Sequence, residues 1–127
     1  MNGLLNLVVL YPGKIVSRHR QIEDVVIDKV CDLKMAVRQL ANKILRKIYP
    51  NHSKDFLKRL LNKLNHCSVV GKEEILNFLQ EVFTSNIPTE LQFLLSEISN
   101  QLLNENARIK IKAIDCLVRI SIANNLE

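Results

Sequence analysis

With 127 residues and a formal net charge of +5, the chain is long enough to bury a core as one domain without metal or disulfide support. Hydrophobic residues make up 47% of the chain, but only 5% of it is aromatic and Trp is absent, which is typical of a helical protein packed with aliphatic side chains. The three cysteines are odd in number and far apart, so the sequence predicts neither a disulfide framework nor a zinc knuckle and favours a reducing compartment.

The opening segment, MNGLLNLVVLY, is apolar and ends in a turn at Tyr11–Gly13. It has no basic start and no small-residue cleavage pattern, and it is shorter than the roughly 20 apolar residues that span a bilayer. We therefore expect an intracellular, cytoplasmic protein with no membrane span. Residues 1–16 are interpreted as an N-terminal extension or cap, and residues 17–124 as the main domain.

Through the rest of the chain, apolar residues recur at three- and four-residue steps, which predicts six helices. These helices run from Ser17 to Val30, from Asp32 to Tyr49, from a Ser53 cap through Leu64, from Glu73 through Phe83, from Pro88 through Leu102 and from Ile109 to Ile122. Turns are predicted between them at residues 31–33, 50–52, 67–71, 86–88 and 104–106.

The segment Asp32–Tyr49, DLKMAVRQLANKILRKIY, shows the helical pattern most clearly. Asp32 is the expected N-cap, and Pro50 is the expected stop because its ring nitrogen carries no N–H. One face of this helix is apolar and the opposite face is basic. The apolar face holds Val37, Leu40, Ala41, Ile44, Leu45 and Ile48, and the basic face holds Lys34, Arg38, Lys43, Arg46 and Lys47.

Three of the predicted helices share a pattern of three apolar residues, in which the second and third residues lie 4 and 8 positions after the first. The three sets are Val37, Ala41 and Leu45; Ile75, Leu79 and Phe83; and Ile109, Ala113 and Leu117. The second set starts 38 residues after the first, and the third starts 34 residues after the second. A period near 36 with two helices per unit indicates a solenoid of helical hairpins. In such a solenoid each hairpin buries one face on its neighbour.

The segments VRQLANKIL and IKIKAIDCL resemble the second helix of HEAT repeats, in which a turn bearing Asp or Asn leads into Val-Arg, then Ala and Leu at four-residue steps. Asp32 before the first segment, and Asn104 and Asn106 around the start of the other, match this pattern. The resemblance implies an all-α fold, an armadillo-like, right-handed α-solenoid of about three HEAT-like hairpins. The middle hairpin departs from the pattern, because Gly71-Lys72-Glu73-Glu74 replaces the Asp and Val-Arg signature.

In HEAT arrays the turns inside the hairpins share one edge, here the turns at 31–34, 67–72 and 104–108. This resembles the TOG-type domains of microtubule polymerases and CLASP proteins, whose intra-repeat turns grip tubulin, although those domains have more repeats and a Trp in the first turn. The resemblance implies a cytoskeletal scaffold, and positive charge along the edge would complement acidic tubulin. The candidate partner-binding residues are Lys34, Arg38, Lys72, Arg108 and Lys110.

Other interpretations stay open. The sequence is compatible with half of a TOG-type domain, with a shortened relative of such domains, and with an unrelated HEAT adaptor that binds another protein. Unpaired flanks of the first and last hairpins would drive homodimerisation or docking onto a larger protein.

Residues 34–63 hold nine basic residues against one acidic residue, whereas residues 64–105 carry a formal charge of −5. The basic block would suit nucleic-acid phosphates, but it has few aromatic residues for base stacking.

No catalytic, cofactor-binding or metal site is predicted. The three histidines are scattered over separate turns and helix ends, and the three glycines are single, so no phosphate-binding loop occurs. Cys116 is expected to be a small buried hydrophobic residue. Cys31 and Cys67 fall at turns, where no neighbour is clearly placed to lower a thiol pKa. We therefore expect a binding module rather than an enzyme.

Overall fold

A computed structural model describes residues 19–52, 55–83 and 91–124, and all regular secondary structure in these ranges is helical. This agrees with the predicted all-α class. The predicted extension at residues 1–16, the Ser53 cap and the break at 86–88 lie outside the described residues.

Six α-helices and two short 3-10 helices make up the described part of the chain. They are α2 (His19–Lys29), α3 (Met35–Ile48), η2 (Tyr49–Asn51), α4 (Phe56–His66), α5 (Val69–Phe83), α6 (Leu91–Ser99), η3 (Asn100–Leu103) and α7 (Ala107–Ala123). The predicted helices therefore all occur, with ends that differ by a few residues.

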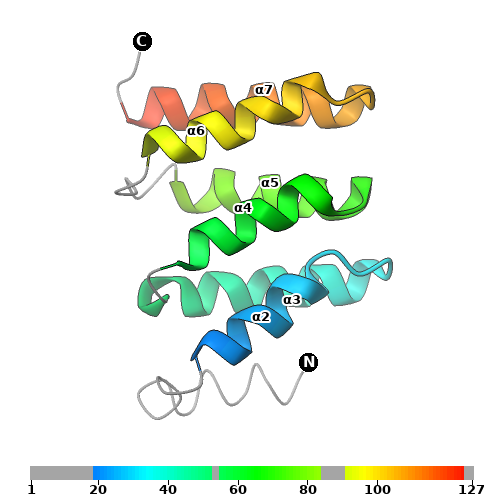
Figure 1. Ribbon diagram of the computed structural model, residues 1–127, viewed down its shortest axis with the longest axis vertical. Coiled ribbons are helices and arrows are strands. Elements are labelled where there is room, and N and C mark those ends of the chain that lie inside the picture. The colour runs from blue at the N-terminus through cyan, green and yellow to red at the C-terminus, as the bar shows by residue number, and fades with distance from the viewer. Residues whose placement is uncertain (1–18, 53–54, 84–90, 125–127) are drawn as a thin grey trace.

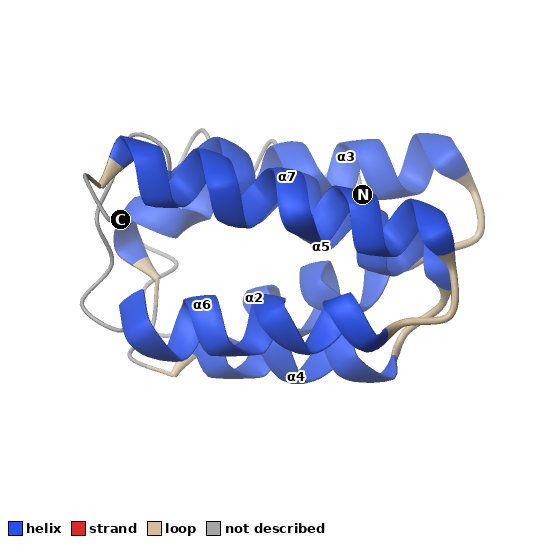
Figure 2. Cartoon of the chain, turned by 90° about the horizontal axis from the view of Figure 1, so that it is seen from above, coloured by secondary structure: helices blue, strands red, loops and turns tan. Residues whose placement is uncertain are grey.

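The helices form three successive pairs, α2 with α3, α4 with α5, and α6 with α7 (Figure 1). Seen from above, α3, α5 and α7 lie in one layer and α2, α4 and α6 lie in the other (Figure 2). Helix α5 packs against both α3 and α7, and α2 packs against α4. Each pair is thus placed to bury its apolar surface against the next pair.

The core follows the three apolar sets found in the sequence. Ala41, Leu79 and Ala113, which share the +4 position, are all fully buried, and two of them are small enough to let neighbouring helices approach closely. Val37 and Leu117 are only partly buried, although both were expected in the core. Both lie in the terminal pairs, which have a described neighbouring pair on one side only.

The starts of α3 and α5 differ from expectation. Asp32 is not the N-cap of α3: Lys34 holds that position, and the Asp32 carboxylate instead accepts the Lys34 backbone N–H at 2.8 Å. Helix α5 begins at Val69, so Gly71 and Lys72 lie inside a helix rather than in the predicted turn. Helix α7 begins at Ala107, two residues before the predicted start, and the Asn106 side chain caps it by accepting the backbone N–H groups of residues 108 and 109.

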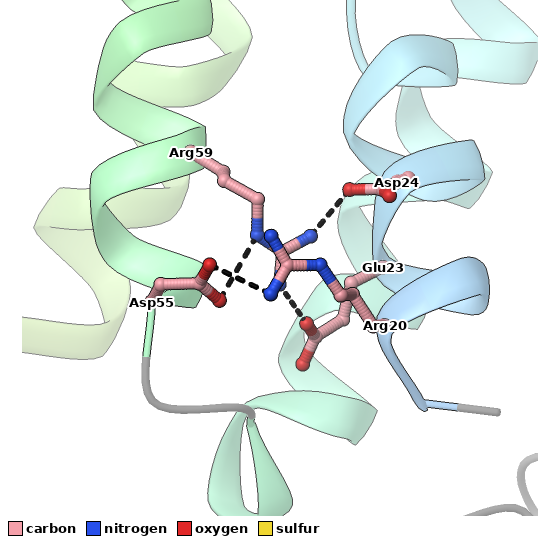
Figure 3. Close-up of polar contacts among 5 residues, drawn as sticks. All are labelled: Arg20, Glu23, Asp24, Asp55 and Arg59. Atoms are coloured by element: carbon pink, nitrogen blue, oxygen red, sulfur yellow. Dashed lines mark hydrogen bonds and ion pairs between the residues drawn. The ribbon is translucent and has the colours of Figure 1, made fainter. Parts of the chain in front are cut away.

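An ion-pair cluster fastens α2 to α4 (Figure 3). The Arg59 guanidinium, 19% exposed, pairs with Asp24 and with Glu23, whose carboxylate is fully buried. Asp55 accepts from Arg59 at 3.2 Å and from Arg20 at 2.8 Å. Burial opposes ionisation of Asp55, but the charges of Arg59 and Arg20 outweigh it and hold its pKa below the ordinary value. One arginine of the second pair thus binds two acids of the first.

Replacing Arg59 with Ala should lower the free energy of unfolding by about 3 kcal/mol, because a buried carboxylate loses its cationic partner. Arg119→Ala is the matched control, since Arg119 makes an exposed pair with Asp115 at 3.0 Å and should contribute less than about 0.5 kcal/mol. Urea unfolding followed by circular dichroism measures both. Equal losses of stability in the two variants would contradict this account of the cluster.

Candidate functional site

The turns inside the three helical pairs lie along one edge of the molecule (Figures 1 and 2). They join α2 to α3 at residues 30–34, α4 to α5 at residues 67–68, and η3 to α7 at residues 104–106. We call this the turn edge. The five residues predicted to bind a partner all lie at or close to it, in the last turn residue before a helix or in the first turns of α3, α5 and α7.

Two of the five predicted residues turn their charges inward. The Arg38 guanidinium donates to the backbone carbonyls of Asp32 and Leu33, each at 2.9 Å, and so closes the α2–α3 turn. The Lys72 ammonium donates to the Leu64 carbonyl at 2.7 Å, in the last turn of α4, where a positive charge stabilises the helix end. These side chains hold the turns together rather than extend into solvent.

The other three are exposed. Arg108 is 79% exposed but is paired with Glu73 of α5 at 3.1 Å. Within the described ranges, the side chains of Lys34 and Lys110 make no hydrogen bond or ion pair. Of the five predicted residues, only Lys34 in the first pair and Lys110 in the third therefore present unengaged positive charges, fewer than the sequence suggests.

A polar network behind the turn edge was not anticipated from the sequence. Gln101, only 4% exposed, donates to Asn65 at 2.9 Å, and Asn65 donates to Glu97 at 2.8 Å. The Gln101 side-chain oxygen also faces the Lys72 ammonium at 3.4 Å. These contacts connect α4, α5, α6 and η3, so they serve to align the second pair with the third.

The basic block at residues 34–63 does not form a single surface. Its first part lies on α3 and its second part on α4, in different layers of the molecule (Figure 2). Arg46 pairs with Glu81 of α5 at 2.7 Å, and Lys63 pairs with Asp28 of α2 at 3.4 Å. Together with Arg59, three of the nine basic residues are thus paired with acids of neighbouring pairs, which reduces the positive charge available to a phosphate backbone.

A second candidate surface is the outer face of α7. Four of its aliphatic side chains are largely exposed, and they recur at three- and four-residue steps, which aligns them along the helix. They are Ile111 (66%), Ile114 (51%), Val118 (49%) and Ile122 (69%), and we call them the α7 stripe. The opposite face of α7 is fully buried at Ile109, Ala113, Cys116 and Ile120. A groove of about 390 Å³ lies beside the stripe, bordered by Gln80, Arg119 and Ile122.

The sequence contained a signal for this surface. From Ile109 to Ile122 the apolar residues are too many for one helical face, and a single 3.6-residue stripe accounts for only half of them. A helix that is apolar on two opposite faces needs partners on both sides. In the structure described here, only one side of α7 has such a partner.

Replacing Lys72 with Ala should lower the free energy of unfolding by about 1–2 kcal/mol, since the Leu64 carbonyl and Gln101 lose a charged donor. Lys110→Ala is the control, because Lys110 is exposed and should stay within about 0.5 kcal/mol of the parent. Thermal and urea unfolding distinguish them. If Lys72→Ala is as stable as Lys110→Ala, the contacts of Lys72 with Leu64 and Gln101 do not stabilise the fold.

Within the described ranges, no group of three or more His, Cys, Asp or Glu side chains is placed to hold a metal ion. No helix there is both long and apolar enough to cross a lipid bilayer. No protein-family model, curated protein or solved structure matches this chain. Function is therefore inferred from the two surfaces above.

Proposed function

We propose that this chain is a non-enzymatic protein-binding module built from three HEAT-like helical hairpins that stack as an α-solenoid. The spacing of its polar contacts supports this. Hydrogen bonds and ion pairs between side chains of α2 and α4, α3 and α5, α4 and α6, and α5 and α7 join residues 32 to 36 positions apart, close to the repeat period. Such contacts connect equivalent positions of consecutive hairpins, as in a repeat protein.

The observation that carries the binding proposal is the register of the α7 stripe. Asn42 and Arg46 lie 5 and 9 residues after Val37, and they contact Glu74 and Glu81 of the next hairpin, each at 2.7 Å. Ile114 and Val118 lie 5 and 9 residues after Ile109 and so hold the same repeat positions.

At those positions a following helix would pack against α7. A repeat whose outer side faced only solvent would carry a polar outer face. In α7 these positions are instead aliphatic and half-exposed. We therefore propose that the occupant is a helix of another polypeptide, with an apolar face of its own, which lies on α7 as α5 lies on α3. Burial of the four side chains would stabilise the complex through the hydrophobic effect.

Tubulin is the second candidate partner, and the turn edge is the surface that would bind it. The favouring observation is that the three turns share one edge, with Lys34 and Lys110 exposed along it. This arrangement agrees with the resemblance to TOG-type domains. Because Arg38 and Lys72 are engaged in the fold, the electrostatic contribution of the edge would come mainly from Lys34, Lys110 and Arg108.

Val118→Lys should abolish capture of the partner protein that the parent chain retains from cell extract, because it places a charge in the centre of the α7 stripe. Val25→Lys is the matched control: Val25 is also a valine on a helix, and its exposed fraction is the same 49%. Both variants should keep the helical content of the parent. Sedimentation velocity shows whether the bound species is instead a second copy of this chain. If Val118→Lys still binds the partner, the α7 stripe is not the binding surface.

Tubulin binding is tested with purified microtubules. The double variant Lys34→Glu/Lys110→Glu should reduce cosedimentation at low salt, since it reverses both unengaged charges of the turn edge. Lys43→Glu/Lys47→Glu makes the same change in net charge at exposed positions further along α3. Equal reductions in the two variants would mean that binding follows net charge rather than this edge, and no binding by the parent would exclude tubulin.

A further inference from the structure

Two half-buried thiols meet at the turn edge. Cys31 follows α2 and Cys67 follows α4, and both pack against the first turns of α5 at Gly71. A Cβ atom on Gly71 would lie 2.8 Å from the Cys31 Sγ and 3.1 Å from the Cys67 Sγ. The two sulfurs therefore flank one backbone position. The missing side chain of Gly71 provides the room for this approach.

Their surroundings make the two thiols unequal. A hydrogen bond from Cys31 lowers the pKa of Cys67, and the positive charges of Lys72 and Lys63 lower it further, against the opposite effect of burial. The same hydrogen bond, together with burial, raises the pKa of Cys31. Both lysines approach Cys67 through the fold and not through adjacent sequence alone, which is why no such neighbour was evident beforehand. Cys67 is the better nucleophile of the two.

We propose that Cys31 and Cys67 are a redox pair that closes to an intramolecular disulfide when a hydroperoxide oxidises the protein. The juxtaposition of the two sulfurs beside Gly71 carries this proposal. It is independent of the partner that either surface binds. Its consequence is a covalent link between the α2–α3 turn and the α4–α5 turn, which would fix two neighbouring hairpins at the edge that bears Lys34.

The chemistry proceeds in two balanced steps with hydrogen peroxide. The Cys67 thiolate attacks one peroxide oxygen, an S–O bond forms as the O–O bond breaks, and the departing hydroxide takes up a proton to give water. Cys31 sulfur then attacks the Cys67 sulfenic acid and releases its proton, and the S–S bond forms as the S–O bond breaks and a second water leaves. The two thiols supply the two electrons that reduce the peroxide.

Cys116 provides an internal comparison. It is fully buried in α7, and its thiol donates to the Leu76 carbonyl at 3.7 Å. Burial raises the pKa of Cys116 to about 12, so it has little thiolate at neutral pH. It should stay reduced under conditions that oxidise the pair.

The test treats the full chain with hydrogen peroxide and analyses it by intact mass and by non-reducing peptide mapping. The parent and Cys116→Ser should each lose two thiols and yield a Cys31–Cys67 linked peptide, which dithiothreitol reverses. The melting temperature of the oxidised protein should rise by about 10 °C, because the link constrains the unfolded chain. Cys67→Ser should form no link, and Cys31→Ser should accumulate a sulfenic acid at Cys67 that dimedone traps.

A second measurement separates the roles of the two sulfurs. Lys72→Gln should slow peroxide oxidation of Cys67 severalfold, because the positive charge of Lys72 lowers the pKa of Cys67, whereas Lys58→Gln, an exposed change on α4, should leave the rate unchanged. Equal rates in these variants would overturn the assignment of Cys67 as the attacking thiol. A link that involves Cys116, a covalent dimer, or a Cys67 sulfenic acid that persists in the parent would overturn the proposal itself.

Discussion

The structure depends on one packing constraint: no helical pair can bury its apolar surface without the pair beside it. Ala41, Leu79 and Ala113 show this most directly, since each is fully buried in the layer formed by α3, α5 and α7. Contacts between pairs also carry the ionic interactions, because Arg59 of the second pair neutralises Glu23 and Asp24 of the first. The stability of each described pair therefore depends on the pair beside it.

The same constraint explains why charge in this sequence gives an incomplete guide to its surface. Basic residues of one pair meet acidic residues of the next, as Arg46 does with Glu81 and Arg108 with Glu73. Of the basic block at residues 34–63, Arg46 pairs with the acidic block, whereas Arg59 and Lys63 pair with acids of α2. The unpartnered α7 stripe stands apart, because aliphatic side chains find no such complement within the described chain.

Much of the fold could be predicted because it rests on periodicity: apolar residues at three- and four-residue steps located all six helices. The start of α5 could not be predicted in this way, because the local sequence around Gly71 and Lys72 resembles a turn. In the structure the Ser68 hydroxyl accepts the Gly71 backbone N–H at 3.3 Å at the start of this helix, a local contact that was not recognised in the sequence. The sequence also located the basic residues of the turn edge but not the direction in which their side chains point, because that direction depends on acceptors brought near by the fold, such as the Leu64 carbonyl for Lys72. An unpaired flank on the last hairpin was expected from the repeat pattern, but the residues of the α7 stripe, visible in the sequence as excess aliphatic content, were not identified as that flank.

Helix α5 has a position that no other described helix shares, with α3 on one side and α7 on the other. Among the described helices, α5 exposes its packed face only when α3 or α7 separates from it, whereas the first and last pairs each have one described pair beside them from which to detach. Native-state hydrogen exchange should therefore be graded along the stack, slowest in the middle and fastest toward both ends. A ligand bound on the outer face of α7 would extend that protected region by one layer and move its centre toward the C-terminus.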